Sequence, residues 1–198
     1  MKYYPHILAV IFFIFFILLG LEPFDRSVWI VEVIPVIGVY LLLVFTYKNF
    51  QFSNISYTLM AFWLFWHTVG GHYTFANVPF DFITELFHFE RNHFDRIGHI
   101  VVGFYAYPMA EFLVRKDYTN KVVASFFGLF FIMSIAASYE IIEWAYAVIE
   151  GGNTGIEFLG SQGDIWDAQK DMLADTIGAI LTLCLFWFID LKRNNYDN

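Results

Sequence analysis

Long apolar runs alternate with short polar connections along the whole chain. A helix needs about 20 apolar residues to cross a hydrocarbon core about 30 Å thick. No internal repeat or low-complexity linker divides the runs. The pattern predicts an all-α fold, a polytopic membrane helix bundle with about six transmembrane helices, in a single domain over residues 1–198. The six runs are Pro5–Leu21, Trp29–Tyr47, Ser56–Tyr73, Phe94–Val114, Val122–Ile149 and Asp171–Leu191.

The first apolar run has two interpretations. Lys2 before an apolar stretch is compatible with a secretory signal peptide as well as with a first transmembrane helix. A signal peptide ends at a small-x-small cleavage site, but Gly20 is followed by Leu21-Glu22-Pro23-Phe24. We therefore expect this helix to be retained.

The longest connection runs from His72 to His93 and contains a second kind of helix. Its segment Pro79–Phe87 mixes Phe and Leu with Asp and Glu. This composition predicts a short helix that lies in the membrane interface rather than across the bilayer.

Composition supports the bilayer as the solvent of this chain. Charged residues make up only 15%, below the roughly 25% usual in soluble domains, while 59% of the residues are hydrophobic. Aromatic residues reach 22%, which suits a lipid-facing surface. The net charge is −8 and the 11 basic residues are scattered, which excludes nucleic acid as a partner. The single cysteine, Cys184, cannot form a disulfide within the chain.

The basic residues predict the orientation. Cytoplasmic loops carry more Lys and Arg than the loops on the opposite side of the membrane. One side of the expected bundle has seven basic residues and the other has four, and the richer side includes both chain ends, so both termini are expected in the cytoplasm. The seven are Lys2, Lys48, Arg115, Lys116, Lys121, Lys192 and Arg193; the four are Arg26, Arg91, Arg96 and Lys170.

The strongest chemical signal is a stripe of carboxylates at the start of the last apolar run. Asp164, Asp167, Asp171 and Asp175 fall within an arc of roughly 80° if the segment is helical. A solvated helix start explains the first two, since acids interact favourably with a helix N-terminus. It explains Asp175 poorly, because that residue is about one turn inside the hydrocarbon. We expect cations near this stripe, or protonated carboxyls within it.

A second ionisable set begins the fourth run. Asp95 and His99 stand four residues apart, so they share one face of a helix. Gly103, Ala106 and Ala110 continue that face, and small residues let a second helix approach closely. The pattern predicts that Asp95 and His99 point into the bundle.

The fifth run carries a third set, Glu140 and Glu143. One interpretation makes them catalytic groups, and the other makes them partners of a structural ion pair. The cations available for such a pair are Arg91, Arg96 and Lys170.

Depth estimates bring the three sets together. With a rise of about 1.5 Å per residue, Asp171 lies at the outer surface of the hydrocarbon and Asp175 about 6 Å below it. Asp95 and His99 occupy the same two levels, and Glu140 lies just beneath the outer surface. Nothing in the sequence fixes the direction of five further candidates: His67, His72, His88, Glu90 and His93.

The residue types favour metal or acid/base chemistry. Many carboxylates, few nitrogen ligands and no thiolate suit Mg²⁺, Mn²⁺ or Ca²⁺, and a histidine keeps Zn²⁺ open. The chain has no glycine-rich phosphate loop, no Gly-x-Ser-x-Gly motif and no His-Glu-x-x-His motif. The candidate ligands are Asp95, His99, Asp164, Asp167 and Asp171, and the candidate catalytic groups are Glu140, Glu143 and Asp175.

Over nearly its whole length the chain resembles the YjdF-like family of bacterial inner-membrane proteins. Three motifs carry the resemblance: Phe94-Asp95-Arg96-Ile97-Gly98-His99, Glu140-x-x-Glu143, and the string from Gly160 to Met172. The resemblance implies a multi-pass protein of the bacterial inner membrane and names no reaction.

A more distant similarity is to VanZ-like proteins, which are associated with teicoplanin resistance. Their pattern has an Asp-Lys-x-x-His element, a Glu-x-x-Gln element and an Asp-x-x-x-Asn-x-x-Gly helix start. This similarity implies a role in the cell envelope. Asp95, His99, Glu140, Asp171 and Gly178 match the pattern, while Arg96 replaces Lys, Glu143 replaces Gln and Asp175 replaces Asn.

Three functions stay open at this stage. The first is a metal-dependent membrane enzyme acting on a lipid-linked or envelope substrate at the outer leaflet. The second is a small proton- or cation-coupled transporter, although neither broken helices nor repeats are visible in the sequence. The third is a structural protein whose polar cluster only fastens the last three helices.

Overall fold

The computed structural model describes residues 3–152, 155, 159 and 161–196, with side chains as far as residue 189. All the regular elements of these residues are helical. They are α1 (Tyr4–Leu19), α2 (Arg26–Thr46), α3 (Asn54–Tyr73), α4 (Asp81–Leu86), α5 (Phe94–Val102), the 3₁₀ turn η1 (Gly103–Tyr105), α6 (Ala106–Arg115), α7 (Lys121–Glu150) and α9 (Asp167–Tyr196).

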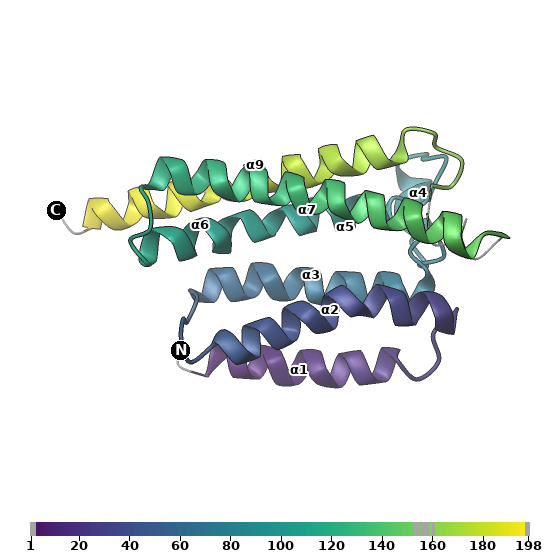
Figure 1. The fold of residues 1–198 in the computed structure, drawn as a ribbon, viewed down its shortest axis with the longest axis horizontal. Helices are drawn as coiled ribbons and strands as arrows, with labels where there is room; N and C mark the ends of the chain where they lie inside the picture. The colour runs from purple at the N-terminus through teal and green to yellow at the C-terminus, as the bar shows by residue number, and fades with distance from the viewer. Residues whose placement is uncertain (1–2, 153–154, 156–158, 160, 197–198) are drawn as a thin grey trace.

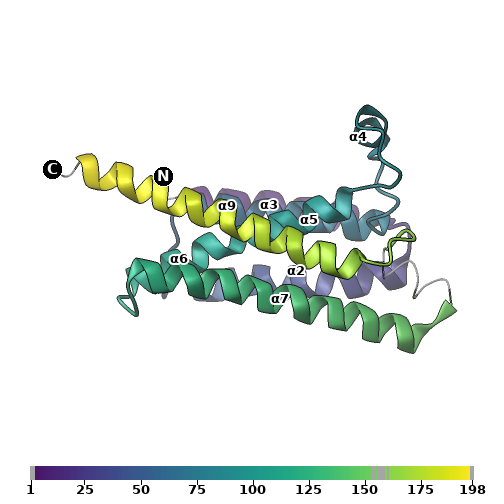
Figure 2. The same cartoon turned by 90° about the horizontal axis from the view of Figure 1, so that it is seen from above.

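The long helices form two layers (Figure 1). One layer holds α1, α2 and α3, and the other holds α5 with α6, α7 and α9. The helix α1 begins and α9 ends at the same end of the bundle. Figure 2 shows the short α4 standing out from the opposite end, which confirms the short helix expected in this connection; its place at the membrane interface stays a prediction. We call the end with α4 the acidic end and the other the basic end.

The helix lengths support a multi-pass membrane protein. Four helical stretches are long and apolar enough to cross a bilayer: Arg26–Thr46, Phe94–Arg115, Lys121–Glu150 and Asp167–Ile189. The helix α1 is apolar but has 16 residues, and α3, with 20, is not among the four. Because α3 packs against α1 and α2 in its own layer and against α5 in the other, it can carry polar residues such as Thr68 and His67 away from lipid. The location of both termini in the cytoplasm stays a prediction.

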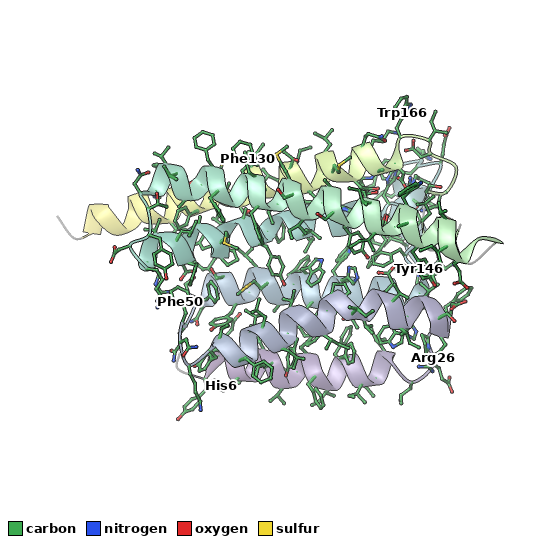
Figure 3. All side chains as sticks on the ribbon, in the orientation of Figure 1. His6, Arg26, Phe50, Phe130, Tyr146 and Trp166 are labelled. Atoms are coloured by element: carbon green, nitrogen blue, oxygen red, sulfur yellow. The ribbon has the colours of Figure 1, made fainter. Side chains whose placement is uncertain are left out.

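The outer surface is apolar, as a lipid-facing surface should be. Phe130 on α7 points away from the bundle (Figure 3) and is 57% exposed. Ile34 on α2 and Leu181 on α9 are also exposed. In water such a surface would aggregate, whereas in a bilayer it contacts hydrocarbon chains.

Two glycines let α5 and α9 cross closely, as the small-residue face predicted. A Cβ at Gly178 would overlap the backbone carbonyl oxygen of Ile100, and a Cβ at Gly103 would overlap the backbone around Ala179. Ala106 and Ala110 are fully buried in the same core. The crossing holds the first turns of the two helices side by side.

The fourth run differs from the single helix expected over Phe94–Val114, because η1 separates α5 from α6. Pro108 lacks the N–H that would bond to the carbonyl of Phe104 in a continuous α-helix. The buried hydroxyl of Thr182 also donates to the carbonyl of Gly103, at 3.3 Å. Both effects disturb the α-helical ladder at this point, and a tighter turn replaces it.

At the basic end, a buried carboxylate joins the two layers. Glu111 of α6 accepts hydrogen bonds from the backbone N–H and hydroxyl of Ser53, both at 2.8 Å, and from the hydroxyl of Ser56. Ser53 is the N-cap of α3, so a side chain from the other layer completes that helix start. Arg115 pairs with the same carboxylate.

Candidate functional site

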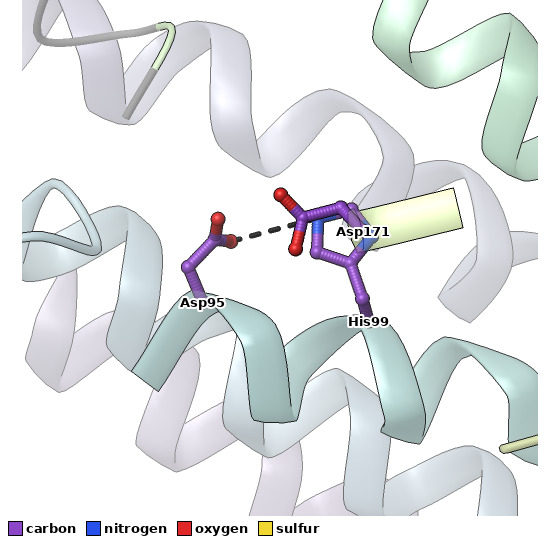
Figure 4. Close-up of side chains that lie close together, drawn as sticks. All are labelled: Asp95, His99 and Asp171. Atoms are coloured by element: carbon purple, nitrogen blue, oxygen red, sulfur yellow. Dashed lines mark ion pairs between the residues drawn. The ribbon is translucent and has the colours of Figure 1, made fainter. Parts of the chain in front are cut away.

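The first turns of α5 and α9 bring three possible ligands together at the acidic end. Asp95, His99 and Asp171 each offer one ligand atom, and these atoms lie within 4.8 Å of one another. Asp95 and His99 rise from one face of α5 toward Asp171 of α9 (Figure 4). His99 and Asp171 are buried and Asp95 is half-buried. The convergence expected from depth is therefore found for these two helices.

Asp175 fixes the orientation of the histidine. The imidazole Nδ1 of His99 donates to Asp175 Oδ2 at 2.9 Å, and Nε2 lies 3.7 Å from Asp95 Oδ1. Asp175 is fully buried, and its other oxygen, Oδ1, has no hydrogen-bond partner among the described residues. A carboxylate that holds one ring nitrogen leaves the other free for a ligand, as in many metal sites.

Two arginines supply the cations expected beside the aspartate stripe. The guanidinium of Arg96 pairs with Asp167, and its Nε lies 2.5 Å from Asp171 Oδ1. Arg91 contacts Asp167 as well, at 2.5 Å. Asp167 is thus held between two guanidinium groups, which offsets the cost of burying it. This places Asp167 with the arginines rather than in the three-ligand group.

Asp164 lies before the first turn of α9, so the expectation that four carboxylates share one helical face is wrong for this residue. The helix begins at Asp167, after a turn in which Gln162 and Gly163 have positive φ. Asp164 instead accepts from Lys170 Nζ at 2.6 Å and from the backbone N–H of Trp166 at 3.1 Å. These hydrogen bonds to the charged form hold the pKa of the Asp164 carboxyl below its usual value.

Glu140 and Glu143, the third ionisable set, lie on α7. Glu143 lines the same cavity as Asp95, His99 and Asp175. Glu140 has a buried oxygen, Oε1, without a hydrogen-bond partner in the described part of the chain. Arg96 and Lys170 form ion pairs with aspartates. The choice between catalytic groups and a structural ion pair for the two glutamates stays open.

Sequence reasoning missed Glu32 and Tyr139 and left His67 without a direction. Glu32 of α2 is 2% exposed, and its Oε2 accepts from the hydroxyl of Tyr139 at 2.9 Å. The Nε2 of His67 lies 3.1 Å from both Oε2 and the backbone carbonyl of Glu32. A glutamate inside an apolar run was itself a signal, because an ionisable residue within a span is costly and seldom incidental.

A cavity of about 590 Å³ lies between the layers. It connects the group around Glu32 with the group around His99. Glu32, His67 and Tyr139 line it from α2, α3 and α7, and His99 and Asp175 line it from α5 and α9. Toward the basic end its walls become apolar: Leu42, Leu43, Met109 and Phe112. The ionisable side chains therefore gather at one end of a mainly apolar cavity.

The other histidines take no part in this cavity. The Nδ1 of His72 donates to the carbonyl of Leu19 at 2.7 Å, which ties α3 to the end of α1. His88 is exposed, as is Glu90. Burial lowers the pKa of His93, and Arg91 and Arg96 lower it further.

The helices and the buried acidic and histidine cluster define a multi-pass helical membrane protein. Comparison with known proteins identifies its family: the chain belongs to the family described as "Predicted membrane protein (DUF2238)", which matches residues 4–192. It is 36% identical to the "Inner membrane protein YjdF" of Escherichia coli (strain K12) over 167 residues, covering 83% of this chain and 79% of that protein. The resemblance drawn from the motifs is confirmed, as is the location in the inner membrane. No solved structure matches the chain.

Proposed function

We propose that the protein is a metal-dependent membrane enzyme that acts on a lipid-linked substrate. The observation that carries the proposal is the group Asp95, His99 and Asp171, whose ligand atoms lie within 4.8 Å of one another beside a mainly apolar cavity. A site that combines buried ligands with an apolar cavity suits a substrate with a polar head and a hydrocarbon part.

The donor set fits a divalent cation. Two carboxylates and one imidazole leave at least one coordination position open, as catalytic sites require, and they suit Zn²⁺, Mn²⁺ or Mg²⁺. Asp175 holds the Nδ1 of His99, so the Nε2 is the nitrogen left for the cation. When bound, the cation would polarise a substrate oxygen or a water molecule.

The remaining acidic residues divide into two roles. Glu143 of α7 lines the same cavity as Asp95 and His99, and Glu140 lies three residues before it on the same helix; both would accept or donate protons. Asp167 and Asp164 are paired with Arg91, Arg96 and Lys170, and they support the site by holding those cations. The proposed ligand set is accordingly narrower than the five residues that the sequence favoured.

Metal binding to the purified protein tests the proposal. After EDTA treatment and dialysis, calorimetric titration with Zn²⁺ and Mn²⁺ should give one equivalent per chain, and Asp171→Asn should weaken the affinity at least tenfold. Asp95→Asn should do the same, and it leaves the pairing of Arg96 intact. The matched control is Asp117→Asn, in the loop at the basic end, where asparagine tolerates the positive φ of 55°. No binding, or equal binding by all three variants, would refute the metal site.

A further inference from the structure

We propose that the cavity holds a single acyl chain, which enters from the bilayer between α2 and α7, with an ester group near Trp63 and the polar head at the acidic end. The inference deepens the proposed function and rests on it for the chemistry at the head. The binding of the chain itself depends only on the cavity.

The polarity of the cavity changes along its length in the way that an amphiphile requires. Glu32 marks its polar end and Thr46 its apolar end on α2. They are 14 positions apart in the sequence, which corresponds to about 21 Å along a helix. One leaflet of a bilayer has a hydrocarbon depth of about 15 Å, half of the roughly 30 Å core. The cavity is long enough for a chain that spans one leaflet, and its volume of about 590 Å³ is that of a site for one small ligand.

The proposed entry lies between two helices that line the cavity and carry exposed apolar residues, α2 and α7. Figure 2 shows α2 and α7 on the same side of the bundle, away from α3 and α5, although the two helices belong to different layers. Both line the cavity, and the Tyr139–Glu32 hydrogen bond joins them at the polar end. Below that bond, Gly38 of α2 lines the cavity with no atom within 4 Å of where its Cβ would be.

A buried donor inside the cavity indicates where a polar atom of the ligand lies. Trp63 lines the cavity and is 7% exposed, yet its indole Nε1 has no hydrogen-bond partner among the described residues. A buried N–H without an acceptor is costly, so a ligand oxygen at this position would stabilise the complex. Trp63 is four residues before His67, hence about 6 Å deeper than the ionisable end. An ester carbonyl just below a polar head occupies this depth, whereas a polyprenyl chain has no oxygen there.

Photocrosslinking tests the chain and its route. The probe is a palmitoyl lysophosphatidylethanolamine with a diazirine at the chain terminus, added to proteoliposomes that contain the full-length protein, followed by mass spectrometry of labelled peptides. Labelling is expected at the apolar end of the cavity, at Leu43 or Met109. Gly38→Trp places an indole ring in the cavity, where it obstructs the chain, and should reduce this labelling at least fivefold. The control Leu41→Trp, on an exposed position of the same helix outside the cavity, should leave it within twofold.

Further outcomes separate the alternatives. Trp63→Phe should weaken labelling by the ester probe several-fold, and a polyprenyl phosphate probe should label the cavity weakly. Equal labelling in the wild type and Gly38→Trp, or labelling confined to exposed positions such as Phe45, would overturn the proposal. Stronger labelling by the polyprenyl probe would overturn the acyl assignment. If Gly38→Trp fails to fold, Gly38→Leu, which places a smaller side chain in the cavity, is used instead. Labelling that survives EDTA in a protein without metal binding would refute the proposed function and leave this inference standing.

Discussion

Arg96 contacts two buried carboxylates, Asp167 and Asp171, and its replacement tests how the acidic cluster is stabilised. In Arg96→Gln, Asp167 keeps Arg91 as a partner at 2.5 Å. Asp171 loses the contact with the Nε of Arg96, which lies 2.5 Å from its Oδ1. The variant therefore leaves one buried carboxylate without its cation.

The size of the effect follows from burial. The side chain of Asp171 is 4% exposed and that of Arg96 is 16% exposed. Removing one partner of a buried ion pair costs about 3–5 kcal/mol, and the partial exposure of Arg96 favours about 3 kcal/mol. In a chain of this size each kcal/mol lowers the melting temperature by about 2–4 °C, which gives a decrease of about 6–12 °C. The control Lys170→Gln removes a 50% exposed cation and should cost less than about 1 kcal/mol.

Thermal unfolding of the purified variants in detergent measures this difference, with EDTA present so that no bound cation replaces Arg96. Adding Asp171→Asn to Arg96→Gln removes the uncompensated charge, so the double variant should recover most of the lost stability. If Arg96→Gln melts within 3 °C of Lys170→Gln, or if the second substitution restores nothing, Asp171 is not a buried anion held by Arg96.

Two further predictions concern the helix crossing and the loop before α9. Gly178→Val places a side chain against the backbone of Ile100 and should lower the free energy of unfolding by about 1–3 kcal/mol. The control Gly38→Val meets open space and should melt within about 2 °C of the wild type. Equal melting temperatures of the two variants would contradict the close crossing. The pKa of Asp164 is lowered in the folded protein, so its stabilising contribution is complete above the unfolded value of about 3.9 and is lost as the pH falls through the folded value. Asp164→Asn should therefore be less stable than the wild type at pH 6, and the difference should shrink below about pH 4; a constant difference between pH 6 and pH 3 would refute the assignment.

The elements could be predicted from the sequence because membrane helices follow from the length and position of apolar runs. The approach of α5 to α9 was predictable too, since Gly103, Ala106 and Ala110 repeat on the face that carries Asp95 and His99. What the pattern could not supply was the start of α9. The spacing predicts a helical face that includes Asp164, but local hydrogen bonds from Trp166 and Lys170 hold that residue in a turn.

The group formed by Glu32, His67 and Tyr139 in the cavity was harder to predict because its members are distant in the chain. Glu32, His67 and Tyr139 come from three helices, and no spacing within one helix relates them. Glu32 could have been identified as a charge within an apolar run, and His67 was a candidate whose direction the sequence left open. Tyr139 gave no signal, because tyrosine is common near membrane interfaces. Its hydrogen bond to Glu32 depends on how the two layers pack against each other.

The carboxylate of Glu111 bears on the order in which the chain assembles in the membrane. The ribosome releases α3 before α6, so the N-terminus of α3 enters the bilayer before the side chain that completes its cap has been synthesised. Until then the backbone N–H of Ser53 and the hydroxyl of Ser56 depend on water at the membrane surface. The arrival of Glu111 replaces that water with a buried acceptor, 58 residues later for Ser53 and 55 later for Ser56. Final closure of the N-terminal layer is thereby linked to insertion of the C-terminal one.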